Sequence, residues 1–166
     1  MEQTEKRTVE IRPIETDDDV RVASIIRTVM PEYGAVGEGY SIEDPEVDAM
    51  AEAYAGDDAA YFVVLVDDVV VGGAGIGPLV GGPSDTCELK KMYLLKEARG
   101  LGIGKRLMHL CLDAARTAGY RRCYLETLGH MAAARALYES HGFRELDAPM
   151  GATGHTGCSN WYVRDL

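Results

Sequence analysis

One segment near the middle of the chain constrains the fold most, because a strand-like run, a glycine-rich basic turn and a long amphipathic helix follow one another there. Residues 89–95 are rich in apolar and aromatic side chains. After the turn, apolar residues recur at helical spacing: Ile103, Leu107, Leu110, Cys111, Ala114 and Ala118. Between these two elements, Gly100, Gly102 and Gly104 lack Cβ atoms and leave backbone N–H groups open to a ligand. The order predicts a turn that holds a pyrophosphate, with the dipole of the following helix adding to the attraction.

Two familiar phosphate-binding motifs do not fit this turn. The dinucleotide fingerprint G-x-G-x-x-G fails from either possible start, because Lys105 and Leu107 stand where it requires glycine. The P-loop pattern fails because Arg99 and Arg106 stand where it requires glycine and a serine or threonine. The pattern that remains is Arg-x-x-Gly-x-Gly. Taken alone, it would also suit a flexible linker or an ordinary strand-to-helix turn.

This pattern resembles the coenzyme A pyrophosphate loop of the GNAT superfamily of N-acetyltransferases, which reads Gln or Arg, x, x, Gly, x, Gly or Ala. A second segment, residues 134–143, resembles the A-x-x-L-Y-x-x-x-G-F segment of the same family. One helix and one strand lie between the two motifs, as the family requires. Gly119 ends that helix and residues 121–127 alternate in polarity like a strand. The chain is therefore identified as resembling a single-domain bacterial GNAT enzyme that depends on acetyl-CoA.

The composition bounds the class of protein. The chain has 166 residues, of which 46% are hydrophobic, so we expect one domain over residues 1–166, with about 8–166 structured. No apolar run reaches the length of a membrane span and residues 1–7 are polar, which predicts a soluble, cytoplasmic protein without membrane contacts. A formal net charge of -10 argues against nucleic acid as a partner. Four cysteines without a CxxC pair predict buried free thiols.

The order of the expected elements predicts an α+β fold with a central mixed sheet. The resemblance adds that helices flank this sheet in three layers and that its strands are mostly antiparallel. The clearest pair is a hairpin of residues 61–66 and 69–76 around Asp67 and Asp68, and glycines are expected to loosen its far end. The remaining strands are expected at 8–13, 86–95, 121–127, 143–146 and 161–164, and the helices at 18–30, 45–55, 103–118 and 131–141.

The resemblance also implies how the chain would hold acetyl-CoA, the expected co-substrate. Backbone N–H groups of the strand before the glycine loop would hold the acetyl carbonyl, at Met92, Tyr93 and Leu94. The loop would bind the pyrophosphate through Arg99, Gly100, Leu101, Gly102, Ile103, Gly104 and Lys105. Family members commonly have an asparagine seven residues before the motif tyrosine, and here that position is Met131. A contact to the pantetheine arm is therefore lost, or is replaced from Thr127 or His130.

Transfer of an acyl group from a thioester to an amine requires a neutral nucleophile, a stabilised oxyanion and a proton for the departing thiolate. Tyr138 matches the motif tyrosine and is the expected general acid, although a core tyrosine on an amphipathic helix is the alternative. Glu88 is the leading candidate for the general base, with Glu126 and His155 as rivals. Glu88 could instead only hold the substrate ammonium, or pair with Lys90 on its own face of the strand.

Fewer residues are candidates for binding the acceptor amine. The segment 31–54 is acidic and carries tyrosines, of which Tyr33 is the expected substrate contact, and such a lip suits a cationic amine. Glu126 and His155 are further candidate substrate contacts. No metal is predicted, because His155 and Cys158 have no second ligand pair beside them. Four basic residues outside the glycine loop are expected to face solvent: Lys90, Lys91, Arg121 and Arg122.

The favoured function is direct acetyl transfer from acetyl-CoA to the primary amine of a small molecule or peptide, without a covalent enzyme intermediate. A non-catalytic acyl-CoA sensor or binding module of the same fold is the first alternative. An acidic interaction protein whose glycine loop is only a turn is the second. The sequence leaves the acceptor amine and the length of the acyl chain open, and the resemblance allows a homodimer without requiring one.

Overall fold

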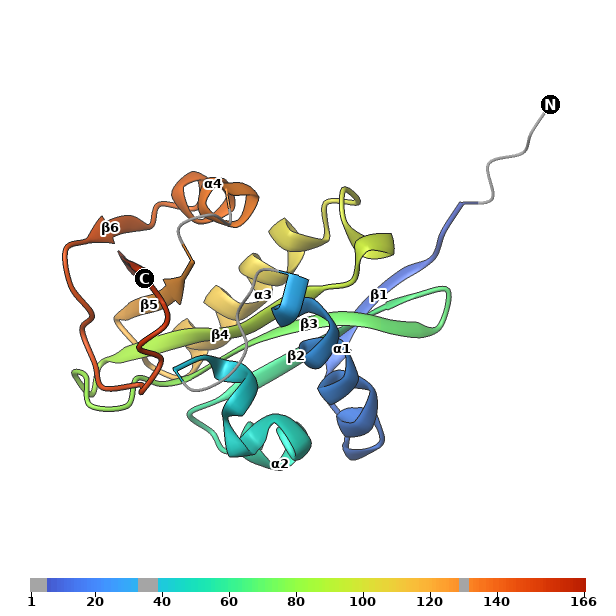
Figure 1. Ribbon diagram of the computed structural model, residues 1–166, viewed down its shortest axis with the longest axis horizontal. Helices are drawn as coiled ribbons and strands as arrows, with labels where there is room; N and C mark the ends of the chain where they lie inside the picture. Colours follow the sequence, from blue (N-terminus) through green and yellow to red (C-terminus); the bar gives the residue numbers. More distant parts are fainter. Residues whose placement is uncertain (1–5, 33–38, 129–131) are drawn as a thin grey trace.

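The computed structural model describes residues 6–32, 39–128 and 132–166, and these form one seven-stranded sheet covered by helices (Figure 1). The strands are β1 (Val9–Pro13), β2 (Ala60–Val66), β3 (Val69–Pro78), β4 (Thr86–Leu94), β5 (Arg122–Thr127), β6 (Arg144–Leu146) and β7 (Asn160–Asp165). They lie in the order β1-β2-β3-β4-β5-β7-β6. In the described sheet, neighbouring strands run antiparallel except for β4 and β5. The prediction of an α+β fold with a mixed, mostly antiparallel sheet is confirmed.

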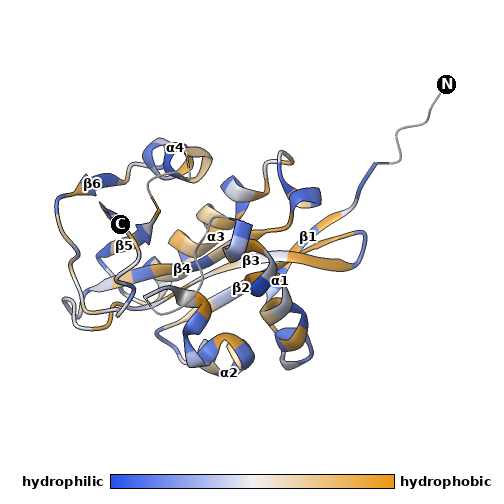
Figure 2. Cartoon of the chain, viewed as in Figure 1, coloured by the Kyte–Doolittle hydropathy of each residue, from blue (hydrophilic) through white to orange (hydrophobic). Residues whose placement is uncertain are grey.

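The helices divide the core into two clusters, one on each face of the sheet. The α-helices are α1 (Asp19–Glu32), α2 (Met50–Ala53), α3 (Ile103–Thr117) and α4 (Ala132–Ser140), and the 3-10 helices are η1 (Thr16–Asp18), η2 (Ser41–Glu43), η3 (Pro45–Asp48) and η4 (Lys96–Ala98). Buried side chains of α3 and α4 share one cluster, and those of α1 and α2 share the other. Figure 2 shows apolar stretches along the strands and both apolar and polar stretches on the helices. No helix in the described ranges combines the length and apolarity needed to cross a bilayer.

The expected hairpin forms between β2 and β3, with Asp67 and Asp68 as its two-residue turn. Both residues have positive φ, 49° and 67°, as a type I′ turn requires. The glycines of β3 do not loosen the strand, which continues to Pro78. They make room for the Tyr61 ring instead, since a Cβ at Gly73 or Gly75 would lie 2.6 or 2.5 Å from its atoms.

Strand β4 contains a bulge that Tyr61 helps to hold. Gly73 pairs with Tyr93 and Gly75 pairs with Lys90, so two residues of β4, Lys91 and Met92, stand opposite one residue of β3. Lys91 has a φ of 49°, which is uncommon for a residue with a side chain. The Tyr61 hydroxyl donates a hydrogen bond of 2.7 Å to the Lys91 carbonyl. A buried phenol of β2, which reaches across β3, thus fixes the backbone where β4 leaves regular pairing.

The sheet splits before β4 reaches this bulge. Strands β4 and β5 are in register at three positions, and Glu88 opposite Tyr124 is the last of them. Strand β5 nevertheless continues its pairing with β7 as far as Thr127 opposite Asn160. The two halves of the sheet therefore separate, and the residues of β4 and β5 that follow Glu88 and Tyr124 do not pair with each other.

Two expectations about local structure need correction. The helix expected at 45–55 is broken into η3 and the four-residue α2, with Ala49 between them at φ -143° and ψ 49°. A tertiary contact explains the break, because the Asp19 carboxylate accepts the Ala51 N–H at 2.8 Å. The cysteines agree with expectation in part: three free thiols are buried, at Cys87, Cys111 and Cys123, while Cys158 is half-buried.

Candidate active site

The glycine loop joins β4 to α3 and exposes its backbone. Gly100 and Gly102 have φ of 79° and 73°, and a Cβ added to either would meet no atom within 4 Å. The backbone conformation therefore requires glycine at these two positions, and packing does not. Gly104 differs, because its Cβ would lie 3.2 Å from Leu137 of α4. The first turn of α3 follows at once, and its N–H groups lack intrahelical partners by geometry.

Arg99, at the start of the loop, ties the loop to the end of β4. Its Nε and Nη2 donate to the Leu94 carbonyl at 3.0 and 2.9 Å, and Nη2 also lies 2.9 Å from the Glu32 carboxylate. Ile103 is buried in the core, so only its backbone is available to a ligand. Leu101 and Lys105 are exposed.

Two cavities lie along the split in the sheet. The first, called the loop cavity, is lined by Val29, Met92, Tyr93, Leu94, Arg99, Gly104, Ala133, Ala134, Leu137 and Tyr138. The second, called the split cavity, is lined by Met30, Tyr40, Glu88, Leu89, Lys90, Lys91, Met92, Tyr93, Leu125, Glu126, Thr127, Leu128, Tyr138, His155 and Cys158. Three residues line both: Met92 and Tyr93 of the β4 bulge region, and Tyr138 of α4. A reaction between two ligands, one in each cavity, would take place beside these three residues.

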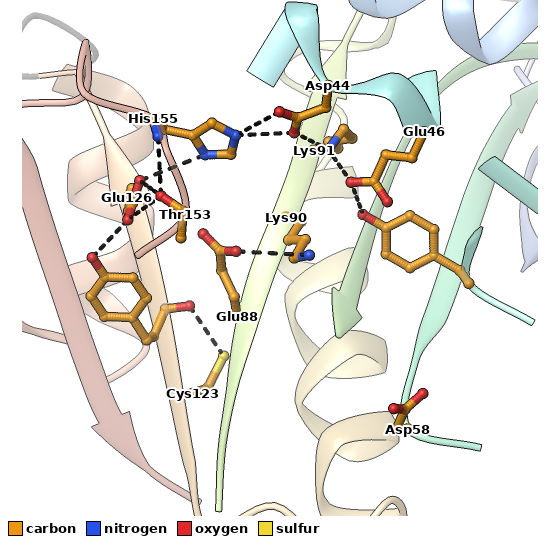
Figure 3. A network of polar contacts seen from close by, with 12 residues as sticks. Asp44, Glu46, Asp58, Glu88, Lys90, Lys91, Cys123, Glu126, Thr153 and His155 are labelled. Atoms are coloured by element: carbon orange, nitrogen blue, oxygen red, sulfur yellow. Dashed lines mark hydrogen bonds and ion pairs between the residues drawn. The ribbon is translucent and has the colours of Figure 1, made fainter. Parts of the chain in front are cut away.

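A network of charged side chains surrounds the split cavity (Figure 3). The His155 imidazole lies 2.9 and 3.0 Å from the two Asp44 oxygens through Nε2, and its Nδ1 lies 3.6 Å from Glu126 Oε2. Lys91 Nζ donates to Asp44 at 2.8 Å and also to Glu46. The Lys91 side chain is only 1% exposed, so these two carboxylates neutralise a charge buried behind the bulge.

Glu88 is a buried carboxyl group of the split cavity. It is 4% exposed, and the Lys90 ammonium lies 3.9 Å from its Oε1. Burial raises the pKa of Glu88 to about 7, a shift that Lys90 opposes and Glu126 reinforces. Near neutral pH this group therefore exists in both protonation states, as a general base requires.

The two rivals of Glu88 have different surroundings. Burial lowers the pKa of His155, but its hydrogen bonds to Asp44 and Glu126 outweigh burial and raise the pKa to about 9. The imidazole is thus a cation at neutral pH and cannot accept a proton there. The Glu126 carboxylate accepts hydrogen bonds of 2.9 Å from the hydroxyls of Tyr124 and Thr153, so its oxygens already have partners within the protein.

Tyr138 is buried and lies between the two cavities. Its ring centroid is 6.2 Å from that of Phe143 and 6.1 Å from that of Tyr162. The side chain thus packs in the core, as the alternative for this residue requires, and also lines both cavities.

The comparisons with known proteins decide the family. The model of the family described as "Acetyltransferase (GNAT) family" matches residues 22–143. The chain belongs to the GNAT acetyltransferase family. A relative from Escherichia coli (strain K12), an uncharacterized N-acetyltransferase called YjgM, is 42% identical over 157 residues, which cover 94% of this chain and 94% of the relative.

Solved GNAT structures have the same fold. A GNAT-family acetyltransferase from Staphylococcus aureus Mu50 is 20% identical, with a TM-score of 0.81 over 95% of this chain and 99% of that chain. A putative acetyltransferase, yncA, from Salmonella typhimurium was solved with its cofactor acetyl-CoA. It is also 20% identical, with a TM-score of 0.75 over 95% of this chain and 92% of that chain.

Several site expectations for this GNAT protein are now placed. Met92, Tyr93 and Leu94 line the loop cavity, and Glu88, Glu126 and His155 meet at the split cavity. The predicted pairing of Glu88 with Lys90 is confirmed at 3.9 Å. Tyr33, His130 and Met131 lie outside the described residues.

Other expectations were wrong. Lys91 does not face solvent, and Lys90 lines the split cavity. Part of the acidic lip is not free to meet a substrate, because Asp44 and Glu46 bind Lys91. The same holds for Asp48, which binds Arg27 at 2.8 Å through both oxygens, and Tyr54 is buried and donates to Glu46 at 3.4 Å.

Sequence reasoning missed the residues that support the site. The Tyr61 hydroxyl holds the bulge at the Lys91 carbonyl. Tyr124 and Thr153 hold Glu126, and Asp44 holds His155 and Lys91. The one local signal was the pair of lysines inside an otherwise largely apolar strand.

The GNAT site also contains a set of ligand atoms that could hold a metal ion. One atom each from Glu88, Glu126 and His155 lie within 4.8 Å of one another. Sequence spacing gave no sign of this set, because the three residues come from different elements. Two carboxylates beside a cavity also suit the ammonium group of an amine.

Proposed function

We propose that this GNAT protein transfers an acetyl group from acetyl-CoA to a primary amine by direct attack. One observation carries the proposal: Glu88, with its pKa raised to about 7, lines a cavity that shares Met92, Tyr93 and Tyr138 with the cavity beside the glycine loop. A base, an acid and two ligand sites therefore lie in sequence along one split. The family resemblance supplies the order in which they would be used.

The glycine loop suits the pyrophosphate of acetyl-CoA. Gly100 and Gly102 leave open space where side chains would stand, and the start of α3 adds N–H groups and a favourable dipole. Lys105, exposed on the first turn of α3, adds a positive charge. Acetyl-CoA, when bound, supplies an activated thioester. The backbone at Met92, Tyr93 and Leu94 would hold the acetyl carbonyl where the bulge releases β4 from regular pairing.

Glu88 and Tyr138 would move the protons. Glu88 accepts one proton from the substrate ammonium, which makes the amine a nucleophile. The new C–N bond forms as the C–S bond breaks, and the Tyr138 hydroxyl protonates the departing sulfur. The second proton lost by the nitrogen restores the Tyr138 hydroxyl. The products are the amide, coenzyme A as a thiol, and one proton released from Glu88.

Direct transfer is also supported by the state of Cys158, the cysteine among the residues that line the split cavity. Burial, reinforced by Glu126 and Glu88, raises its pKa to about 12. The group therefore remains a thiol at neutral pH and is a poor nucleophile. A covalent acetyl-enzyme at this residue is disfavoured.

The test is a thiol-release assay with acetyl-CoA and a broad panel of amines, accompanied by a thermal shift with acetyl-CoA alone. Amine-dependent release of coenzyme A is expected. Acetyl-CoA that stabilises the protein without thiol release from any amine would support the sensor or binding module. Acetyl-CoA that neither binds nor stabilises would contradict the proposal altogether.

A further inference from the structure

We infer that the acceptor is a small amine with one ammonium group and a compact, largely apolar body, and not an amine of a polypeptide chain. The inference rests on the proposed function and names the class of its acceptor. It is carried by two loops that meet across the split cavity.

The two loops come from opposite sides of the split and are joined directly. Residues 39–48 connect the segment after α1 to α2, and residues 151–159 precede β7. The Gly157 N–H donates to the Gly39 carbonyl at 2.8 Å. His155 and Asp44 add a second link at 2.9 and 3.0 Å (Figure 3). Tyr40 of one loop and His155 of the other both line the split cavity, so the junction forms part of its wall.

The junction leaves no room for another chain. A Cβ at Gly157 would lie 2.3 Å from Cζ of the Tyr40 ring, and a Cβ at Gly39 would lie 2.6 Å from Thr156 Oγ1. An extended peptide that paired with either loop would need a spacing of about 4.8 Å from each backbone. The two loops are already in van der Waals contact, so a polypeptide cannot pass between them.

The charges of the junction are balanced within the protein. Asp44 binds both Lys91 and His155, and Glu46 binds Lys91. Glu126 is held by hydroxyl donors, whereas Glu88 has, among the described residues, an ion pair with Lys90 at 3.9 Å and His155 within 4.8 Å but no hydrogen-bond donor. The split cavity thus offers one carboxylate site to an incoming ammonium. A polyamine would require a second.

The rest of the cavity wall favours an apolar body. Uncharged side chains make up most of its lining, and they include Met30, Tyr40, Leu125 and Leu128. Burial of apolar surface against them would stabilise a bound alkyl or arylalkyl amine. A second ammonium on the acceptor would have to be desolvated beside Lys90 and beside a Glu126 carboxylate that Tyr124, Thr153 and His155 already hold.

The experiment compares three kinds of acceptor in the thiol-release assay at saturating acetyl-CoA. The probes are small monoamines such as butylamine and 2-phenylethylamine, the polyamine spermidine, and unstructured peptides with a free N-terminus or an internal lysine. We expect kcat/KM for the best monoamine to exceed that for spermidine and for either peptide by about 100-fold or more. A peptide or spermidine within tenfold of the best monoamine would overturn the inference while leaving acetyl transfer intact.

A second arm opens the junction. His155→Ala removes one link, and Tyr40→Ala removes the ring against Gly157 without breaking an ion pair of the network. Either variant is expected to raise the peptide-to-monoamine ratio of kcat/KM by about tenfold. His109→Ala removes an exposed histidine of α3, outside both cavities, and should leave the ratio unchanged. An unchanged ratio in both opened variants would mean that the junction does not exclude peptides. Thiol release from no amine at all would overturn the proposed function and this inference together.

Discussion

The two sides of the site use different parts of the chain: one uses backbone groups and the other uses side chains. The proposed donor side is a contiguous loop, Arg99–Lys105, whose glycines expose backbone N–H groups. The proposed acceptor side is a set of side chains, among them Asp44 and His155, that only the tertiary fold brings together. A backbone site tolerates changes in neighbouring side chains, whereas a side-chain network depends on each partner. The donor should therefore be fixed by the fold and the acceptor by a few specific contacts.

The largest expected effect lies on the acceptor side, at Glu88. Glu88→Gln keeps the size of the side chain and removes the base, so kcat/KM should fall by about 10³-fold. The wild-type profile of kcat/KM should rise with pH through an apparent pKa near 7, and the variant should lose this limb. The measurement is thiol release between pH 5.5 and 9. Glu97→Gln, an exposed change in η4, is the matched control, and an unaltered profile in Glu88→Gln would exclude Glu88 as the base.

The next effect tests Tyr138, one of the three residues that line both cavities. Tyr138→Phe keeps the ring in the core and removes the proton donor, so kcat should fall by about 10²-fold while the KM for acetyl-CoA stays within about threefold. Tyr120→Phe provides the control, because the Tyr120 hydroxyl bonds to the Asp58 carbonyl away from both cavities. A rise in KM with unchanged kcat would mean that Tyr138 binds acetyl-CoA without acting as the acid.

A smaller effect tests whether the donor side is a backbone site. Gly102→Ala places a methyl group where a ligand would approach and strains a residue with φ of 73°. The Kd for acetyl-CoA should rise about tenfold, measured by calorimetry. Gly119→Ala has the same kind of strain at φ 90°, with nothing within 4 Å, but lies at the far end of α3. Gly119→Ala should lower the free energy of unfolding by about 1 kcal/mol, as Gly102→Ala should, and should leave the Kd for acetyl-CoA unchanged. Equal losses of affinity in both variants would contradict a ligand site at Gly102.

The smallest effect concerns the stability of the acceptor network. The pKa of His155 is raised from 6.5 to about 9, so its ion pairs stabilise the fold fully below pH 6.5, and this stability is lost as the pH rises through 9. Because the group is partly exposed, the loss should be about 1 kcal/mol. Urea unfolding at pH 6.5 and 9 would measure it, and His155→Gln should show a smaller change. Equal pH dependence in the two proteins would mean that the network contributes nothing to stability.

The sequence predicted the contiguous parts of this molecule well. The hairpin around Asp67 and Asp68, the helix from Ile103 and the glycine loop each depend on neighbours in the chain, and the structure contains them. The helix expected at 45–55 failed because Asp19, far away in sequence, takes a backbone donor of that segment. Lys91 was misplaced for the same reason, since nothing local shows that it would meet Asp44. Local periodicity has no access to such long-range partners.

The contact between Tyr61 and the Lys91 carbonyl has a consequence for tolerance to mutation. The ring reaches the bulge only because Gly73 and Gly75 leave space for it, although neither glycine lines either cavity. A deep mutational scan selected for activity should therefore find these two positions among the least permissive of β3. During divergence toward new acceptors, the loops at 39–48 and 151–159 could change while this inner strand stays fixed. The positions least able to change would then be residues that do not contact a substrate.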